Sequence, residues 1–121
     1  MKIFWLACLS IAISVAAQFA LKAGMSSAAV KAALQGPLDG RALWVTLTRP
    51  EVLLGFALYG LGAVVWLAVL ARWDVSKAYP LVGLGFVASL AVGALLGEQV
   101  GAVRAAGVLL ICLGVALVAR S

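Results

Sequence analysis

The chain of 121 residues is 66% hydrophobic and 11% charged, with a mean hydropathy of +1.21. A soluble domain of this length cannot bury so much apolar surface, so the composition predicts an integral membrane protein. The basic residues that give a formal net charge of +5 are scattered singly between apolar runs, which excludes a nucleic-acid-binding patch. The chain has no histidine, so we expect no transition-metal site, and we predict no cofactor.

The first apolar run extends from Ile3 to Leu21 and is bounded by Lys2 and Lys22. At about 1.5 Å per residue it is about 28 Å long, enough for one membrane crossing. A signal peptide would look similar, but three more apolar runs follow, so we interpret residues 3–22 as a retained membrane helix.

A polar stripe lies inside this first run. Ser10, Ser14, Gln18 and Lys22 recur every four residues, which places them along one slowly drifting face of a helix. Such a face is costly in hydrocarbon unless it meets other helices or a hydrated cavity. The stripe is therefore the candidate transport path.

Residues 23–49 are much more polar, and the segment Gly36–Gly40 predicts a turn in their middle. Residues 26–34 and 41–47 could each form a short helix in the membrane interface, with Trp44 at headgroup depth. An ordinary solvated loop would explain the same composition.

The second span is predicted over residues 50–71. Pro50 lies in its first turn, and Thr48 and Glu51 have the spacing of a capping box. Gly55 and Gly62 lie on one face, which would let another helix approach closely.

Two aromatic residues of the second span, Tyr59 and Trp66, are seven residues apart and share a face. We interpret them as packing residues rather than as a platform for a ligand.

The third span is predicted over residues 78–96 and the fourth over residues 100–119. Pro80 marks the start of the third helix, which we favour, or a break within that helix. Glu98, between the two spans, is expected to cap the fourth helix or to pair with Arg104.

Glycines of the third and fourth spans give these helices smooth surfaces suited to helix contact. They predict an oligomer interface at Gly93, Gly97, Gly107 and Gly114. An even number of spans places both termini on one side of the membrane, and the basic residues divide four against five between the sides, which favours neither orientation.

Several short motifs occur in an order and spacing that resemble the four-helix members of the drug/metabolite transporter superfamily. The resemblance is strongest to the subunits of the aminoarabinose-phosphoundecaprenol flippase. The matching residues are 14–18 with Lys22, 66–70, 78–81, Gly97 with Glu98, and Gly107 with Gly114. The loop 23–49 does not match.

The resemblance implies an all-α integral membrane protein with four transmembrane helices in one domain, residues 1–121. Its fold would be small multidrug resistance-like, equivalent to half of an EamA-type transporter. It also implies transfer of a polyprenyl-phosphate-linked sugar across the bacterial inner membrane, as a homodimer or as a heterodimer with a paralogous four-helix subunit. The expected partners are thus a polyprenyl-phosphate glycolipid, membrane lipids and a second subunit, and no nucleic acid.

Such a lipid presents an anionic phosphodiester, a polar sugar and an apolar tail, so its site needs a cation, neutral hydrogen-bonding groups and a groove open to lipid. The candidate binding residues are Ser14, Gln18, Lys22, Arg72, Lys77 and Tyr79. The basic side chains among them would equally suit anchoring in the headgroups. Gln18 is the sharper case, because an amide inside a span needs a hydrogen-bonding partner.

Two other functions fit a chain of this size. A small multidrug antiporter exchanges a cation for protons and needs an acid within the membrane. All four acids of this chain lie at or outside the span ends, which favours an anion site: Asp39, Glu51, Asp74 and Glu98. A non-transporting accessory subunit remains the second alternative. An enzyme is not predicted, because the sequence shows neither paired acids nor a nucleophile–base pair.

Overall fold

The computed structural model describes residues 2–121, which are mostly helical and contain no strand. The elements are α1 (Lys2–Met25), α2 (Ala28–Gln35), α3 (Gly40–Leu47), α4 (Pro50–Leu70), α5 (Val75–Ala78), the 3₁₀-helix η1 (Tyr79–Val82), α6 (Gly83–Leu95) and α7 (Ala102–Arg120). Four segments are long and apolar enough to cross a membrane, namely α1, α4, the continuous stretch from α5 to α6, and α7. The prediction of an all-α integral membrane protein with four spans is confirmed.

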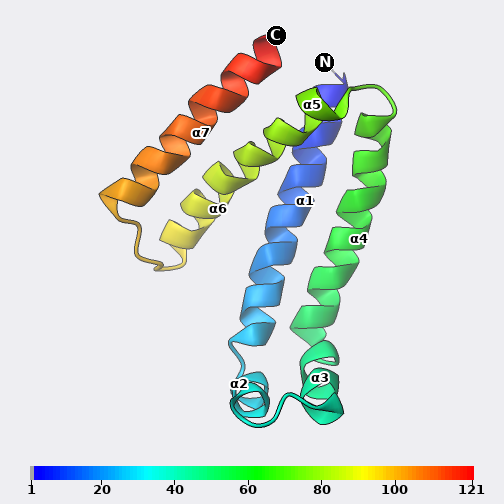
Figure 1. Cartoon of the computed structure of the whole chain (residues 1–121), viewed down its shortest axis with the longest axis vertical. Helices are drawn as coiled ribbons and strands as arrows, with labels where there is room; N and C mark the ends of the chain where they lie inside the picture. The colour runs from blue at the N-terminus through cyan, green and yellow to red at the C-terminus, as the bar shows by residue number, and fades with distance from the viewer. Residues whose placement is uncertain (1) are drawn as a thin grey trace.

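The helices form two antiparallel pairs (Figure 1). α1 and α4 lie side by side and make the most extensive contact in the chain, with α2 and α3 at the far end of this hairpin. α6 contacts both α1 and α7, so it joins the second pair to the first. α1 begins and α7 ends at the same end of the bundle, as an even number of spans requires.

Glycines allow α1 and α4 to approach each other closely. A Cβ atom added to Gly55 would lie 2.5 Å from Leu21 Cδ2, and one added to Gly62 would lie 3.2 Å from Ser14 Oγ. The buried hydroxyl of Ser10 donates a hydrogen bond of 2.7 Å to the Gly62 carbonyl oxygen. The predicted close approach of a helix at Gly55 and Gly62 is thus confirmed, and the approaching helix is α1.

Glycines at the start of α6 also allow close contact with α1 and with α7. A Cβ atom on Gly85 would lie 3.2 Å from Ile11 Cγ2 of α1, and one on Gly83 would lie 2.9 Å from Val115 Cγ2 of α7. Ile11 and Val115 belong to one buried cluster, which Leu81 of η1 joins from the centre. The start of α6 therefore packs against both α1 and α7, next to the buried Leu81 of η1.

The segment 23–49 forms both short helices, with bounds within two residues of those expected. Ser27 caps α2 by accepting a hydrogen bond from the backbone of its third residue. Asp39 caps α3 by accepting from the N–H groups of Arg41 and Ala42, each at 3.1 Å. Placement of these helices in the membrane interface stays a prediction.

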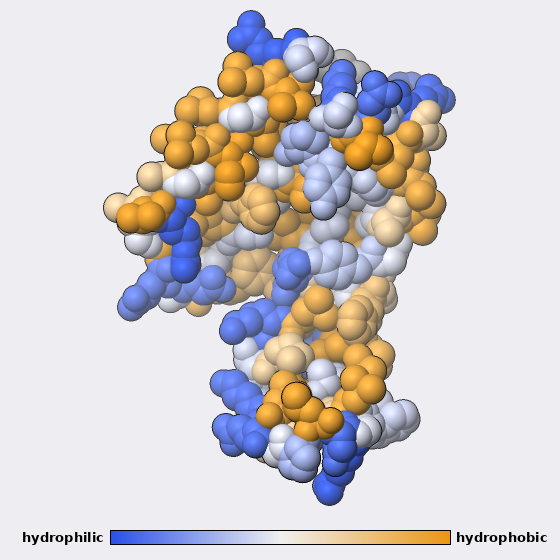
Figure 2. All heavy atoms as spheres, in the orientation of Figure 1, coloured by the Kyte–Doolittle hydropathy of each residue, from blue (hydrophilic) through white to orange (hydrophobic). Residues whose placement is uncertain are grey.

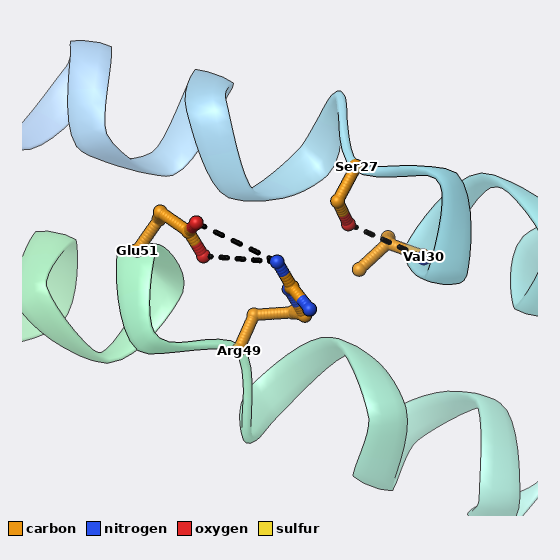
Figure 3. A network of polar contacts seen from close by, with 4 residues as sticks. All are labelled: Ser27, Val30, Arg49 and Glu51. Carbon is orange, nitrogen blue, oxygen red and sulfur yellow. Dashed lines mark hydrogen bonds and ion pairs between the residues drawn. The ribbon is translucent and has the colours of Figure 1, made fainter.

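The predicted capping box at the start of α4 is wrong. Arg49 is the N-cap residue and makes no side-chain cap, while Pro50 occupies the first turn as expected. The Thr48 hydroxyl instead donates to the Trp44 carbonyl oxygen of α3 (2.7 Å), because Thr48 is the C-cap residue of α3. Glu51 forms an ion pair with Arg49 at 3.5 Å, in the space between the two arms of the hairpin (Figure 3).

The favoured interpretation of Pro80 as a helix start is also wrong. The helical segment begins earlier, at Val75, and Pro80 lies in η1 between α5 and α6. A proline inside a helix lacks an N–H and crowds the preceding turn. The backbone accordingly tightens to 3₁₀ geometry over four residues, so Pro80 is the break within the helix that was the second alternative.

We expect Gly55→Leu to destabilise the fold, because its side chain would enter the space that Leu21 fills. Overpacking of this kind costs about 1 to 3 kcal/mol. The measurement is reversible unfolding in bicelles. Gly60→Leu is the matched control, since an added Cβ at Gly60 meets nothing within 4 Å. Equal stability of the two variants would contradict the packing described for α1 and α4.

Candidate functional site

A groove of about 670 Å³ lies between the α1–α4 hairpin and α6. From α1 it is lined by Ser10, Ser14, Gln18 and Lys22, which is the complete polar stripe identified in the sequence. Figure 2 shows less hydrophobic residues running down the middle of this face, between strongly hydrophobic flanks. The stripe therefore faces a cavity between helices, as its cost in hydrocarbon requires.

Residues of the stripe differ in what they contact. Each step of four residues rotates the helix face by about 40°, so Lys22 lies about 120° around α1 from Ser10. Ser10 consequently faces α4 and is only 3% exposed, whereas Gln18 and Lys22 are exposed. The Ser10 hydroxyl is used in the contact with α4, so the stripe residues that can bind a ligand are Ser14, Gln18 and Lys22.

Gln18 finds the partner that its position demands. Its side-chain amide donates a hydrogen bond to the hydroxyl of Tyr59 on α4, across the groove. Tyr59 and Trp66 both line the groove, and whether they also contact a ligand stays a prediction. Trp66 also packs against the buried cluster that contains Ile11, so it contributes both to the core and to the groove wall.

The α6 side of the groove was missed by sequence reasoning. Phe86 and Ser89 line it, together with the backbone of Gly85. Ser89 is the one hydroxyl residue between Leu81 and Leu96. A lone polar residue in an apolar span is a signal that could have pointed to the groove.

Glu98 also lines the groove, and its predicted structural role is wrong. The N-cap of α7 is Gly101, without any side-chain hydrogen bond, and Arg104 donates to the Gln99 carbonyl oxygen at 2.9 Å. Among residues 2–121 the one ion pair joins Arg49 to Glu51. Neither Glu98 nor Lys22 therefore has an ion-pair partner in the part of the chain that the structure describes.

A Schellman motif at the end of α6 places Glu98. The N–H of Glu98 bonds to the Gly93 carbonyl oxygen (2.9 Å) and that of Gly97 to the Ala94 carbonyl oxygen (3.2 Å). Gly97 has a φ of +90°, which a side chain would disfavour. The Glu98 carboxylate lies over Gly93, where an added Cβ would be 2.8 Å from Oε1. Gly93 and Gly97 thus have a role within the chain, and their predicted place in an oligomer face stays a prediction.

Arg72, Lys77 and Tyr79 lie outside this groove. They belong to the segment around α5, at the end of the bundle opposite to α2 and α3 (Figure 1). The Lys77 ammonium lies 4.5 Å from the centre of the Trp73 ring, and Tyr79 is 65% exposed. The six predicted binding residues thus divide into two groups, and only the α1 group lines the groove.

We expect a thiol at position 14 to react with a membrane-impermeant maleimide, because a groove with a polar wall should admit water and thiolates form only where water can solvate them. The parent protein for this measurement has Cys8 and Cys112 replaced by Ala. Ala16→Cys is the control, since it lies two residues further along α1, is exposed, and does not line the groove. Equal labelling at both positions would show that the stripe does not border a hydrated space.

No family model matches this chain, and no solved structure matches it. Curated relatives in Pseudomonas aeruginosa (strain LESB58) and Pseudomonas savastanoi pv. phaseolicola (strain 1448A) are 42% and 41% identical to it over 76 residues. Both are named probable 4-amino-4-deoxy-L-arabinose-phosphoundecaprenol flippase subunit ArnE. The match spans 62% of this chain, and 66% and 60% of the respective relatives. The resemblance predicted from the motifs is confirmed, and the chain is similar to flippase subunits of this name.

Proposed function

We propose that this chain is a subunit of a flippase that moves a polyprenyl-phosphate-linked sugar across the bacterial inner membrane. The observation that carries this proposal is the polar face of α1, which lines a groove and ends in Lys22, a cation with no ion-pair partner among residues 2–121. The relatives named as flippase subunits support it independently.

The groove offers one kind of group for each part of such a lipid. Lys22 provides the positive charge for the phosphodiester, and Gln18 and Ser14 provide hydrogen bonds to the sugar. Phe86 and Trp66 are apolar walls along which the first part of the polyprenyl chain can lie. From Ser10 to Lys22 the helix rises about 18 Å, so the polar path extends well into the membrane.

A cation–proton antiporter fits the groove less well. Its mechanism needs an acid at membrane depth that binds either a proton or the drug cation. The sequences of α1, α6 and α7 contain no acid, and that of α4 contains only Glu51 in its first turn. Glu98 lines the groove, but it lies in the turn after α6 and outside the span helices.

We expect Lys22→Ala to weaken binding of a polyprenyl-phosphate sugar by about ten- to a hundredfold, the loss of one charge-assisted hydrogen bond. Gln18→Leu should reduce transport without unfolding the chain, because Leu suits a lipid-surrounded helix. Binding is measured in nanodiscs and transport in proteoliposomes.

The control for Lys22→Ala is Lys31→Ala, which removes an exposed cation that does not line the groove. Wild-type binding and transport in both Lys22→Ala and Gln18→Leu would exclude the groove as the substrate site. Tighter binding of a lipophilic quaternary ammonium compound than of the phosphate lipid would favour the antiporter instead.

The outer face of α7 supports a second subunit. Val103, Leu110 and Leu117 recur every seven residues on it and are 88%, 68% and 71% exposed. Gly107 and Gly114 lie beside this row, and a Cβ atom added to either meets nothing within 4 Å. We propose that this face contacts a second four-helix subunit, either another copy or a paralogue, since the relatives are named as subunits.

We expect Gly114→Leu to weaken assembly, because a bulky side chain would separate the two α7 surfaces. Ala105→Leu is the control. Ala105 precedes Gly114 by nine residues and so lies on the opposite side of α7. Subunit association is measured by energy transfer between labelled proteins in liposomes. A monomeric wild-type protein with full activity would contradict the proposed interface.

A further inference from the structure

We propose that Glu98 is a specificity-determining residue, which receives a cationic amino group on the sugar of the transported lipid. Together with Lys22 it would read a zwitterionic headgroup, one residue meeting the phosphate and the other the amine. This inference rests on the proposed function and adds to it the chemistry of the sugar.

The position of Glu98 is built into the backbone. The Schellman motif folds its N–H back onto Gly93, and Gly97 supplies the left-handed residue that the motif needs. The absence of a side chain at Gly93 leaves room for the carboxylate directly above it. The backbone of Glu98 is thereby fixed against the end of α6, and its exposed side chain lines the groove.

The charges of the groove are opposite and separate. Lys22 reaches it from the end of α1 and Glu98 from the end of α6, and no ion pair joins them among residues 2–121. Both helices run in the same direction, so the two charges lie at the same end of the bundle. A ligand that carries a negative and a positive group can occupy the space between them and contact both.

Arg104 is the other charged residue near Glu98. The two residues border a smaller cavity of about 280 Å³ between α6 and α7. The Arg104 guanidinium donates to the Gln99 carbonyl oxygen and forms no ion pair with Glu98. The carboxylate therefore keeps its capacity to accept hydrogen bonds from a ligand.

An amino sugar suits this carboxylate better than a neutral sugar does. An ammonium group makes charge-assisted hydrogen bonds with a carboxylate, which are stronger than those of a hydroxyl. A neutral sugar in the same place would displace water from Glu98 without supplying a countercharge. The relatives carry 4-amino-4-deoxy-L-arabinose in their names, which is a sugar of the expected kind.

The test compares two synthetic short-chain polyprenyl-phosphate lipids, binding to the full chain in nanodiscs. One carries a 4-amino-4-deoxy pentose and the other carries the same pentose with a hydroxyl group in place of the amine. We expect the wild-type protein to bind the amino lipid about tenfold more tightly. Glu98→Gln should abolish this preference and change affinity for the hydroxyl lipid by less than about twofold.

Two further variants make the test specific. Asp74→Asn removes one negative charge at the opposite end of the bundle and should keep the preference. Gly93→Ala keeps the Glu98 charge and places a methyl carbon 2.8 Å from the position of Glu98 Oε1, so the carboxylate must shift and the preference should decrease. If Glu98→Gln does not fold, Glu98→Ala takes its place, and an undiminished preference in that variant overturns the inference.

The outcomes separate the inference from the function on which it rests. Equal binding of both lipids by the wild-type protein, or a full preference in Glu98→Gln, would overturn the role of Glu98 and leave the flippase proposal standing. Binding of neither lipid by the wild-type protein would overturn both.

Discussion

The close contact between α1 and α4 determines how the polar residues of this protein can be used. In an apolar chain, a hydroxyl or an amide is tolerated in the membrane only with a partner or beside water. The glycines of α4 bring its backbone so near that Ser10 bonds directly to the Gly62 carbonyl oxygen. This contact fixes the rotation of α1 about its own axis. Because the stripe drifts around the helix, the same rotation that buries Ser10 turns Gln18 and Lys22 toward the groove.

Two backbone features in the second half of the chain shape the groove, namely the break at Pro80 and the turn that contains Glu98. Pro80 interrupts the helix that begins at Val75, and η1 forms at that point, where Leu81 joins the buried cluster. α6 then runs from the α1 contact toward the turn that contains Glu98. The break at Pro80 sets the direction of α6, and the turn after α6 sets the position of Glu98.

The groove of this membrane protein is lined by one basic and one acidic residue. Lys22 and Glu98 face the same groove, while Asp39, Arg49 and Glu51 are engaged in caps or ion pairs within the hairpin. Within residues 2–121 neither of these two groove charges has an ion-pair partner, which is the reason for proposing a headgroup that carries both signs of charge. The sparse packing of α7 leaves the bundle open on the side where a second subunit is proposed.

Much of this organisation could be predicted from sequence, because in a membrane it depends on local rules. Span positions follow from the length of apolar runs, and the stripe from a period of four residues. The close approach at Gly55 and Gly62 follows from the lack of side chains on one face. Each of these features is a property of a single helix, so it needs no knowledge of what that helix contacts, beyond the existence of a neighbour.

Other features were decided only by tertiary structure, since they depend on distances between helices. Thr48 bonds to α3 and not to Glu51 because it is the C-cap residue of α3, while Arg49 is the N-cap residue of α4. Tyr59 becomes part of the site only because α4 lies opposite Gln18. Glu98 looked like a capping residue because it precedes a helix, but the φ of Gly97 turns the chain so that its carboxylate covers Gly93 and faces the groove. The sequence alone determined which residues are polar within the spans. Which of them share one cavity was determined by how closely the glycine-lined helices pack.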